Sequence, residues 1–303
     1  MDMNDRNLVI GVGECLFDLL PEGARLGGAP ANFAYHAGQL LGMDRALVVS
    51  ALHEDALGKR MKEELSRRGL RALMPEVGYP TGKVNIAMDK GGIPHYTILE
   101  DVAYDHIPFT PEMESVARRA AVVCFGTLAQ RNINSQSTIQ RFLDATPDGC
   151  RKVFDINLRQ HFYGKDIIGQ SLTKCNILKL NEDELPIVCR MFDLGEGTAE
   201  ARCHQIMERW NIDIVIYTCG AAGSYVYALG HSSFKASPKV EVVDTVGAGD
   251  SFTAAFCSAL LVGKDIDDAH RLASDLSAYV CTQSGAMPTV PQPRYSLTEA
   301  RPA

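Results

Sequence analysis

Short runs of apolar residues recur along the chain, and stretches with helical periodicity separate them. The runs are continuous rather than alternating, which is typical of strands buried on both faces of a parallel sheet. Between two runs, Leu57, Met61 and Leu65 repeat every four residues, and Gly69 ends this predicted helix over 56–68. This alternation predicts an α/β fold with a doubly wound sheet. The predicted strands lie within residues 8–13, 46–52, 120–126, 153–157, 176–180 and 213–218.

Residues 81–99 depart from this pattern. Val84, Ile86 and Met88 alternate with polar neighbours, a turn is expected at DKGG, and the alternation then resumes. This arrangement predicts a half-buried β-hairpin, which we expect to lie outside the main sheet as a flap. No internal repeat, low-complexity tract or Pro/Gly linker divides the chain, so we expect a single domain with a small β appendage.

The balance of charges argues against a large phosphate-binding surface. The chain has 30 Lys and Arg against 37 Asp and Glu, a formal net charge of -7. This charge disfavours nucleic acid or an anionic membrane as the main partner. The nine cysteines show no CxxC spacing and suggest neither a disulfide framework nor a zinc site. No apolar stretch is close to the length of about 20 residues that a membrane span needs, and the first residues lack a secretion signal. We therefore expect a cytoplasmic protein.

The segment VEVVDTVGAGDSFTAAF predicts a strand that ends at Asp244 and a helix that begins near Gly249. Residues 247–249 leave backbone N–H groups unobstructed at the positive end of the helix dipole, which suits an anion such as a transferring phosphoryl group. Asp250 stands beside this site and could take a proton from a substrate hydroxyl. The alternative is a glycine turn in which Asp250 only complements the helix N-terminus.

The segment GGAPANFAYH begins with a glycine pair at 27 and 28 and continues as a predicted helix. Asn32 falls in the opening turn of that helix. Its side-chain amide and the nearby backbone amides could converge on a polyhydroxylated ligand. The alternative is an ordinary helix start with an Asn near its cap.

Two further segments follow predicted strands. In LKLNEDEL, Asn181 and Glu184 are three residues apart, which is the spacing of a capping box. Their oxygens could instead hold the water shell of a Mg²⁺ ion bound to ATP phosphates. In YTCGAAGSYVY, Gly220 and Gly223 could let a nucleotide approach the backbone, although a plain tight turn fits equally well.

Several common catalytic motifs are absent from the sequence. There is no GxxxxGK[ST] phosphate loop, and GVGECL has Leu16 where a dinucleotide fingerprint needs its third glycine. A dinucleotide-dependent oxidoreductase is therefore disfavoured. The histidines form no HExxH, and no serine stands in GxSxG, so metalloprotease and hydrolase functions lack support.

Taken together, GGAPANFAYH and DTVGAGDSFTAAF resemble the two signatures of the ribokinase-like, pfkB-type sugar kinases. The resemblance implies a three-layer αβα domain over residues 1–303 with a mostly parallel sheet. It also implies a small β lid over 81–104 together with roughly 14–26, often shared across a homodimer. The implied reaction transfers the γ-phosphoryl group of ATP to a primary hydroxyl of a small sugar.

The resemblance also assigns roles to individual residues. Asp250 matches the catalytic base, and Gly247, Ala248 and Gly249 match the anion hole. For the remaining roles, the matching residues are Asp18, Gly28 and Asn32 for sugar hydroxyls; Asn181 and Glu184 for Mg²⁺ and phosphate; Thr218, Gly220, Gly223 and Gly249 for ATP; and Asp244, Val246, Val280, Gln283, Gly285 and Thr289 for a monovalent cation such as K⁺.

Smaller differences bear on the substrate. Ala29 and Pro30 stand where ribokinases typically have a lysine, which looks like the fructokinase branch, and the sequences AYD at 103–105 and DINLR favour the same branch. Arg159 of DINLR is placed among the sugar-binding residues. Because a guanidinium also suits a carboxylate, a 2-keto-3-deoxygluconate kinase is the main alternative, followed by a ribokinase. A non-catalytic sugar or nucleotide sensor is an alternative of another class.

Overall fold

The apolar runs pair side by side as the strands of one large sheet. The computed structural model describes residues 7–21, 23–88, 94–292 and 294–297. In this part of the chain, nine strands lie in the order β13-β12-β11-β10-β9-β8-β1-β4-β5. All neighbours from β5 to β11 are parallel, and β12 and β13 are antiparallel at one edge. The strands are β1 (Leu8–Val12), β4 (Ala46–Val49), β5 (Arg71–Leu73), β8 (Ala120–Phe125), β9 (Arg151–Asp155), β10 (Ile177–Asn181), β11 (Ile214–Thr218), β12 (Ser224–Ala228) and β13 (His231–Lys235).

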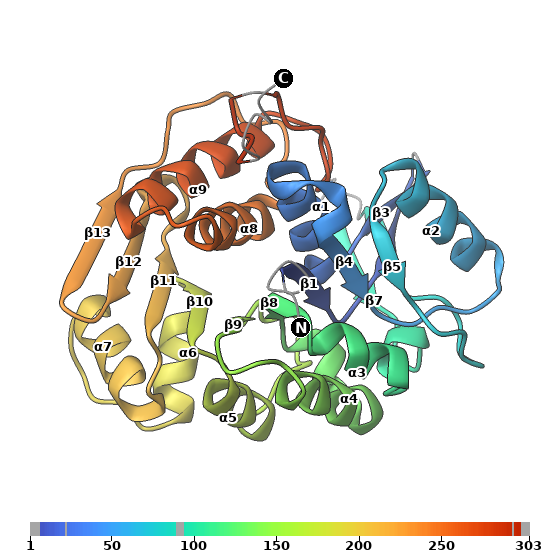
Figure 1. Cartoon of the computed structure of the whole chain (residues 1–303), viewed down its shortest axis with the longest axis horizontal. Coiled ribbons are helices and arrows are strands. Elements are labelled where there is room, and N and C mark those ends of the chain that lie inside the picture. The colour runs from blue at the N-terminus through green and yellow to red at the C-terminus, as the bar shows by residue number, and fades with distance from the viewer. Residues whose placement is uncertain (1–6, 22, 89–93, 293, 298–303) are drawn as a thin grey trace.

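Helices cover both faces of this sheet (Figure 1), which confirms the three-layer αβα fold. In the view of Figure 1, α1, α8 and α9 lie above the sheet, and α3 to α7 lie below it. The helices are α1 (Ala29–Leu41), α2 (Ala56–Arg67), α3 (Pro111–Ala117), α4 (Ile133–Asp144), α5 (Lys165–Lys174), α6 (Glu184–Met191), α7 (Ala199–Trp210), α8 (Ala248–Leu261) and α9 (Ile266–Cys281), with short 3-10 turns η2 (Met43–Arg45), η3 (Ala103–Asp105), η4 (Leu128–Arg131) and η5 (Gly220–Ala222).

Successive residues of each central strand are buried on opposite faces of the sheet. On β10, Ile177 belongs to the core formed with α1, α8 and α9, whereas Leu178 belongs to the core formed with α3 to α7. Val122 and Val123 divide in the same way on β8. This double burial explains why the strands are continuous apolar runs rather than alternating ones.

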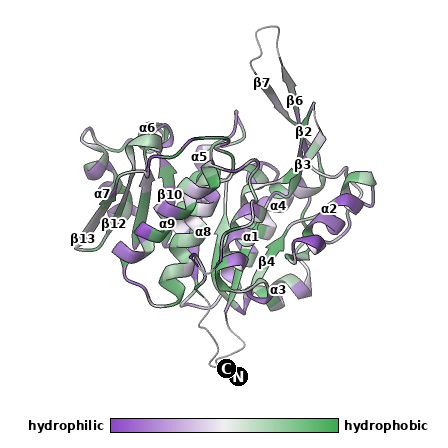
Figure 2. Ribbon diagram, turned by 90° about the horizontal axis from the view of Figure 1, so that it is seen from above, coloured by the Kyte–Doolittle hydropathy of each residue, from purple (hydrophilic) through white to green (hydrophobic). Residues whose placement is uncertain are grey.

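A second sheet stands apart from the large one. It has the order β3-β2-β6-β7 in the described residues, and Figure 2 shows β6 and β7 extending beyond the rest of the molecule. The antiparallel pairing of β6 with β7 confirms the predicted hairpin, while its expected turn at DKGG falls in residues 89–92, outside the described residues. The strands are β2 (Leu16–Leu20), β3 (Gly23–Gly27), β6 (Lys83–Met88) and β7 (Pro94–Ile98).

The predicted strand that ends at Asp244 is wrong. Residues 240–244 form no strand, and Val242 and Val243 are exposed. The amides of Val243 and Asp244 both donate to the carbonyl of Cys281, the last residue of α9, instead of to a neighbouring strand. The segment is therefore an extended connection into α8.

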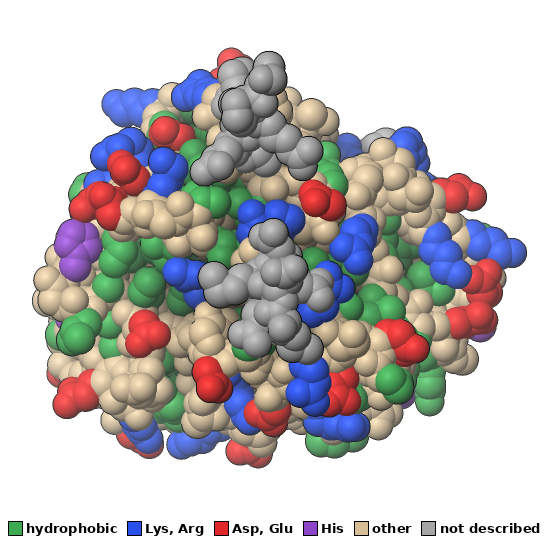
Figure 3. All heavy atoms as spheres, in the orientation of Figure 1, with side chains coloured by type: hydrophobic (Ala, Val, Ile, Leu, Met, Phe, Trp, Pro, Cys, Tyr) green, Lys and Arg blue, Asp and Glu red, His purple; other side chains and the backbone are tan. Residues whose placement is uncertain are grey.

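The outer surface carries both signs of charge. On the face drawn in Figure 3, acidic and basic side chains are interspersed rather than gathered into one large patch. In the described part of the chain, no helix has the length and apolar character needed to cross a membrane.

Candidate active site

The first turn of α8 faces a junction between the large sheet and α1. Gly247 caps the helix with φ +80, and a Cβ at this position would lie 2.7 Å from the carbonyl oxygen of Ala286. Only glycine fits such a position without strain. The turn thereby lies at the positive end of the helix dipole, and within it the Ala248 amide donates to the Thr245 carbonyl at 3.3 Å.

Asp250 contacts Asn32 across the interface of α8 with α1. The Asn32 side-chain amide donates to Asp250 Oδ2 at 2.8 Å, although the two residues are 218 positions apart in the sequence. Asn32 is buried, and its Oδ1 has no hydrogen-bond partner among the described residues. A buried acceptor left open beside a carboxylate is suited to bind a hydroxyl group of a ligand.

The environment of Asp250 favours its protonated form. Burial raises the pKa of this carboxyl to about 6, and the negative charge of Asp155 contributes to the increase. The hydrogen bond from Asn32 opposes the shift. A carboxyl group with a pKa close to neutrality is well matched to accept a proton from a hydroxyl group.

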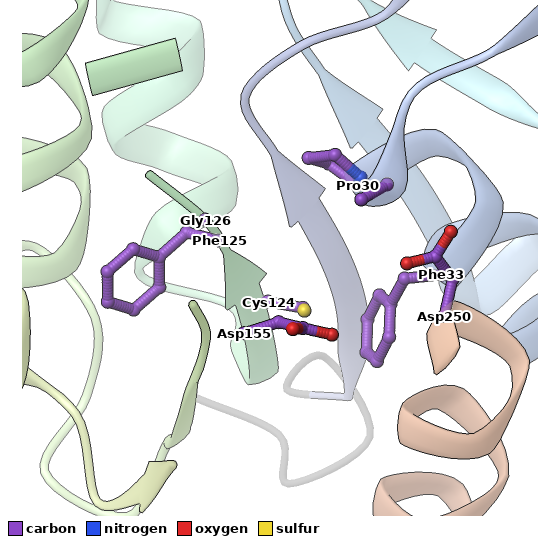
Figure 4. Close-up of a pocket in the computed structure, with 8 residues that line it drawn as sticks. Pro30, Phe33, Cys124, Phe125, Gly126, Asp155 and Asp250 are labelled. Carbon is purple, nitrogen blue, oxygen red and sulfur yellow. The ribbon is translucent and has the colours of Figure 1, made fainter. Parts of the chain in front are cut away.

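A small pocket opens between the carboxyl ends of β8 and β9 and the first turns of α1 and α8 (Figure 4). Asp155 lines it from the sheet side, and Asp250 lines it from the α8 side. This edge is where ligands bind in open α/β sheets. The other lining residues are Ala29, Pro30, Phe33, Cys124, Phe125 and Gly126.

Glu14 is a further candidate site residue that was not predicted from the sequence. Its side chain is buried directly after β1, and Oε2 has no hydrogen-bond partner among the described residues. Burial, with a smaller effect from Asp250, raises its pKa to about 7. Gly28 packs against it, because a Cβ at that position would lie 2.4 Å from the Glu14 carbonyl oxygen. A charged residue between two apolar segments was the available sequence signal.

Asp18 and Arg159 approach the same region from different elements. Asp18 lies on β2 of the small sheet, and burial raises its pKa, while the charges of Arg159 and Arg25 oppose the shift. Arg159 lies in the loop after β9 and is exposed. Its charge also lowers the pKa values of Glu14 and Asp250, so the structure brings this guanidinium near the carboxylates of the site.

Asn181 and Glu184 adopt the reciprocal arrangement of a capping box. The Asn181 Oδ1 atom accepts the Glu184 amide at 2.9 Å, and Glu184 Oε2 accepts the Asn181 amide at 2.8 Å. The other carboxylate oxygen of Glu184 accepts the Leu158 amide at 2.8 Å. These hydrogen bonds tie the β10–α6 junction to the loop that holds Arg159.

Thr218 ends β11 beside that junction, and its carbonyl accepts the Glu182 amide at 3.0 Å. Gly220 and Gly223 follow with φ values of +48 and +128. They form the turn between β11 and β12. Thr218, Gly220 and Gly223 therefore lie at the same edge of the sheet as Asn181, whereas Gly249, also predicted for ATP, lies in the first turn of α8.

The segments predicted for a monovalent cation are joined in part. Asp244 Oδ1 accepts the Val246 amide, and Oδ2 accepts the Gly285 amide, each at 3.0 Å. Val280 and Gln283 are connected to each other by a backbone hydrogen bond. The Thr289 carbonyl instead accepts the Tyr279 hydroxyl. In the described ranges, no group of three or more His, Cys, Asp and Glu side chains is arranged to hold a metal.

Curated proteins similar to this chain phosphorylate more than one kind of sugar, according to their names. An ATP-dependent 6-phosphofructokinase from Thermoanaerobacterium thermosaccharolyticum is 27% identical, with 93% of this chain and 90% of that protein covered. A ribokinase from Arabidopsis thaliana is 30% identical over 88% of this chain and 69% of its own length. A fructokinase from Vibrio alginolyticus is 26% identical over 94% and 96%.

Solved structures share the fold. Fructokinase from Xylella fastidiosa with bound ATP superposes with a TM-score of 0.81 at 18% identity, covering 94% of this chain and 95% of that one. A putative ribokinase II from E. coli in complex with ATP and Mg²⁺ gives 0.77 at 19% identity over 93% and 94%. A fructokinase double mutant from Vibrio cholerae O395 with fructose, ADP and potassium ion bound gives 0.78 at 21% identity over 95% and 97%.

The family model described as pfkB family carbohydrate kinase matches residues 23–293, which include both the Asn32 segment and the Asp250 segment. The chain therefore belongs to the pfkB family of carbohydrate kinases and is an ATP-dependent phosphotransferase.

Proposed function

We propose that this kinase transfers the γ-phosphoryl group of ATP to a primary hydroxyl group of fructose, with Asp250 as the catalytic base. The observation that carries this proposal is the contact of Asn32 with Asp250 at the first turn of α8. Through this contact the Oδ1 of Asn32, free within the described part of the chain, lies next to the Asp250 carboxyl, whose pKa is raised to about 6, at the N-terminus of α8.

Each group has a defined task in the transfer. As the hydroxyl oxygen bonds to the γ-phosphorus, its O–H bond breaks and the proton passes to Asp250, while the bond to the ADP oxygen breaks and ADP takes its electron pair. The backbone amides of Gly247, Ala248 and Gly249 stabilise the charge on the transferring group. Asn32 holds Asp250 in place through its amide and accepts a sugar hydroxyl through Oδ1.

The sugar lies between the small sheet and the large one in this proposal. Asp18, Gly28 and Arg159 surround it together with Asn32. The chain forms a single domain over 1–303 in this proposal. Its small sheet, residues 81–104 with roughly 14–26, is a lid that excludes water and so limits hydrolysis of ATP. An exposed face of this lid is also the proposed contact of a homodimer.

ATP is proposed to lie along the edge formed by Asn181, Thr218, Gly220 and Gly223. Asn181 and Glu184 supply oxygens, which suit Mg²⁺, but their hydrogen bonds to backbone amides favour contact through the water shell of the ion. Asn181 and Glu184 would hold this ion through its water shell, and the ion would supply positive charge that offsets the charge of the phosphates.

A monovalent cation such as K⁺ is proposed near Asp244. The carboxylate is held by the Val246 and Gly285 amides, and carbonyl groups of the surrounding segments supply the neutral oxygens that such ions bind. The fructokinase double mutant from Vibrio cholerae O395 has potassium bound together with fructose and ADP.

Fructose is favoured by Ala29 and Pro30 in the first signature and by the fructokinases among the relatives. The 2-keto-3-deoxygluconate kinase is the second candidate because of Arg159. This guanidinium is exposed and donates to the neighbouring Leu158 carbonyl at 3.2 Å. It is therefore open to a substrate carboxylate.

ADP release separates these candidates. The assay contains ATP, Mg²⁺ and one of fructose, ribose, 2-keto-3-deoxygluconate or a nucleoside, and kcat/KM is compared across them. The proposal expects the highest value for fructose. A higher value for 2-keto-3-deoxygluconate or for ribose would identify that compound as the substrate. No ADP release with any of the compounds would favour the non-catalytic sensor.

A further inference from the structure

A buried ion pair lies between the large sheet and α8. Lys179 on β10 donates to Asp155 Oδ1 on β9 at 3.0 Å, and the parallel register places these two residues directly side by side. Lys179 is 7% exposed and Asp155 is 3% exposed. Charges this deeply buried are rare unless they are paired.

The pair packs against the turn that carries the proposed base. Lys179 Nζ lies 3.1 Å from the position that a Cβ on Gly249 would occupy. Thr253, one turn further along α8, donates to the Gly249 carbonyl at 3.0 Å and approaches Asp155 Oδ2 at 3.4 Å. The first turn of α8 therefore rests directly on the pair.

Asp155 and Asp250 also line the same pocket (Figure 4). Two carboxylates facing one small space disfavour each other's charge, whereas Lys179 favours the charge of both. The 3.0 Å hydrogen bond of Lys179 Nζ to Asp155 Oδ1 holds the ammonium beside this space.

The other groups around Asp250 come from every adjoining element. Glu14 follows β1, Arg159 follows β9, and Asn32 comes from α1. Cys124 on β8 is neutral because burial raises its thiol pKa. From α9, Ser277 contacts the Ala248 carbonyl at 3.0 Å. Among these groups, Asp155 and Lys179 form the hydrogen-bonded charge pair beneath α8.

Stability alone is a weak explanation for the pair. Buried ion pairs are often matched or exceeded in stability by apolar residues of similar size, because removing two charges from water is costly. We propose that Asp155 and Lys179 are positioning residues for phosphoryl transfer: the pair sets the charge beneath the first turn of α8 and so controls how readily Asp250 accepts the hydroxyl proton. This inference rests on the proposed role of Asp250.

The two members of the pair act on Asp250 in opposite directions. Asp155→Asn removes the repelling carboxylate and leaves the Lys179 charge uncompensated, so Asp250 loses its proton at lower pH. Lys179→Met leaves Asp155 unopposed, so Asp250 keeps its proton to higher pH. The double variant removes both charges and lies between the single variants. Shifts of about one pH unit or more are expected for charges this close.

The test is the pH dependence of kcat/KM for the sugar that the wild-type enzyme phosphorylates best. In the wild type, activity is expected to rise with pH through about 6, as Asp250 loses its proton. The proposal expects this rise at lower pH in Asp155→Asn and at higher pH in Lys179→Met. Shifts in the same direction, or no shift in either variant, overturn it. The matched control is Asp105→Asn, which breaks the buried pair of Arg131 with Asp105 and is expected to lower stability without moving the pH dependence.

Two further variants keep the outcome unambiguous. Asp250→Asn tests the proposed base itself, and retained activity in that variant overturns the base rather than the pair alone. If a single variant fails to fold, Asp155→Leu/Lys179→Met replaces the pair with apolar side chains. In this double variant, with KM for ATP and sugar retained, activity should rise at higher pH than in Asp155→Asn or at lower pH than in Lys179→Met, whichever of the two folds. The same pH dependence in the double variant and in that single variant overturns the inference.

Discussion

Replacement of Asp250 by Asn is expected to stabilise the fold while it removes activity. The carboxyl is half-buried near Asp155, and its ionisation is therefore unfavourable in the folded state. An amide of the same shape carries no charge, and its oxygen can accept the hydrogen bond that Asn32 donates to Oδ2. The substitution thus removes the free-energy cost of ionising the carboxyl in the folded state and keeps the hydrogen bond with Asn32.

The size of the effect follows from the pKa shift. Folding raises the pKa of Asp250 from 3.8 to about 6, and each unit is worth about 1.4 kcal/mol. Because the folded-state pKa is raised, the stabilising contribution is complete below the unfolded value and is lost as pH rises through about 6. Asp250→Asn should therefore be more stable than the wild type by about 3 kcal/mol at pH 8, and the gain should vanish near pH 4.

Thermal unfolding at a series of pH values measures this difference. A chain of this length gains roughly 2 °C per kcal/mol, so the Tm of Asp250→Asn should exceed that of the wild type by about 6 °C at pH 8. The control is Asp267→Asn. Hydrogen bonds from Ser233 and Lys235 lower the pKa of Asp267 to about 2, so its contribution is present at neutral pH and this variant should lose stability. A gain at Asp250 that is independent of pH, or a loss at pH 8, refutes the reasoning.

Two other substitutions and two changes of the metal ions test separate parts of the site. Gly247→Ala forces a Cβ onto φ +80 and against Ala286, so unfolding should become easier by about 1–3 kcal/mol and kcat should fall; an unchanged Tm contradicts this. Arg159→Met should raise KM for the sugar at least tenfold with KM for ATP unchanged in steady-state kinetics, and the reverse pattern places Arg159 at the nucleotide. Chelation with EDTA should abolish ADP release until Mg²⁺ is restored, and replacement of K⁺ by Na⁺ should lower the rate; full activity in EDTA contradicts the Mg²⁺ assignment.

The sequence predicts much of the fold because the main signals are local. Burial on both faces requires continuous apolar strands, so runs such as those at β8 and β10 could be recognised without their neighbours. The start of α8 was equally readable from its glycines. The apolar segment at 240–244 misled the prediction because strand formation needs a partner strand, and the Val243 and Asp244 amides donate to the end of α9 instead.

The charged residues beside Asp250 were harder to predict. Asp155 and Lys179 are 24 positions apart and meet only through the parallel register of β9 with β10. Glu14 reaches the site because Gly28 allows close packing of two segments. Such contacts depend on the tertiary structure. The sequence indicates them only weakly, by a charged residue inside or next to an apolar run.

The most direct test of the account is the kcat of Asp250→Asn with ATP, Mg²⁺ and fructose, measured on protein whose Tm shows it to be folded. If Asp250 takes the hydroxyl proton, kcat should fall by at least about 10²-fold while fructose still binds. A kcat within tenfold of the wild-type value would contradict the assignment of the base and, with it, the proposed mechanism.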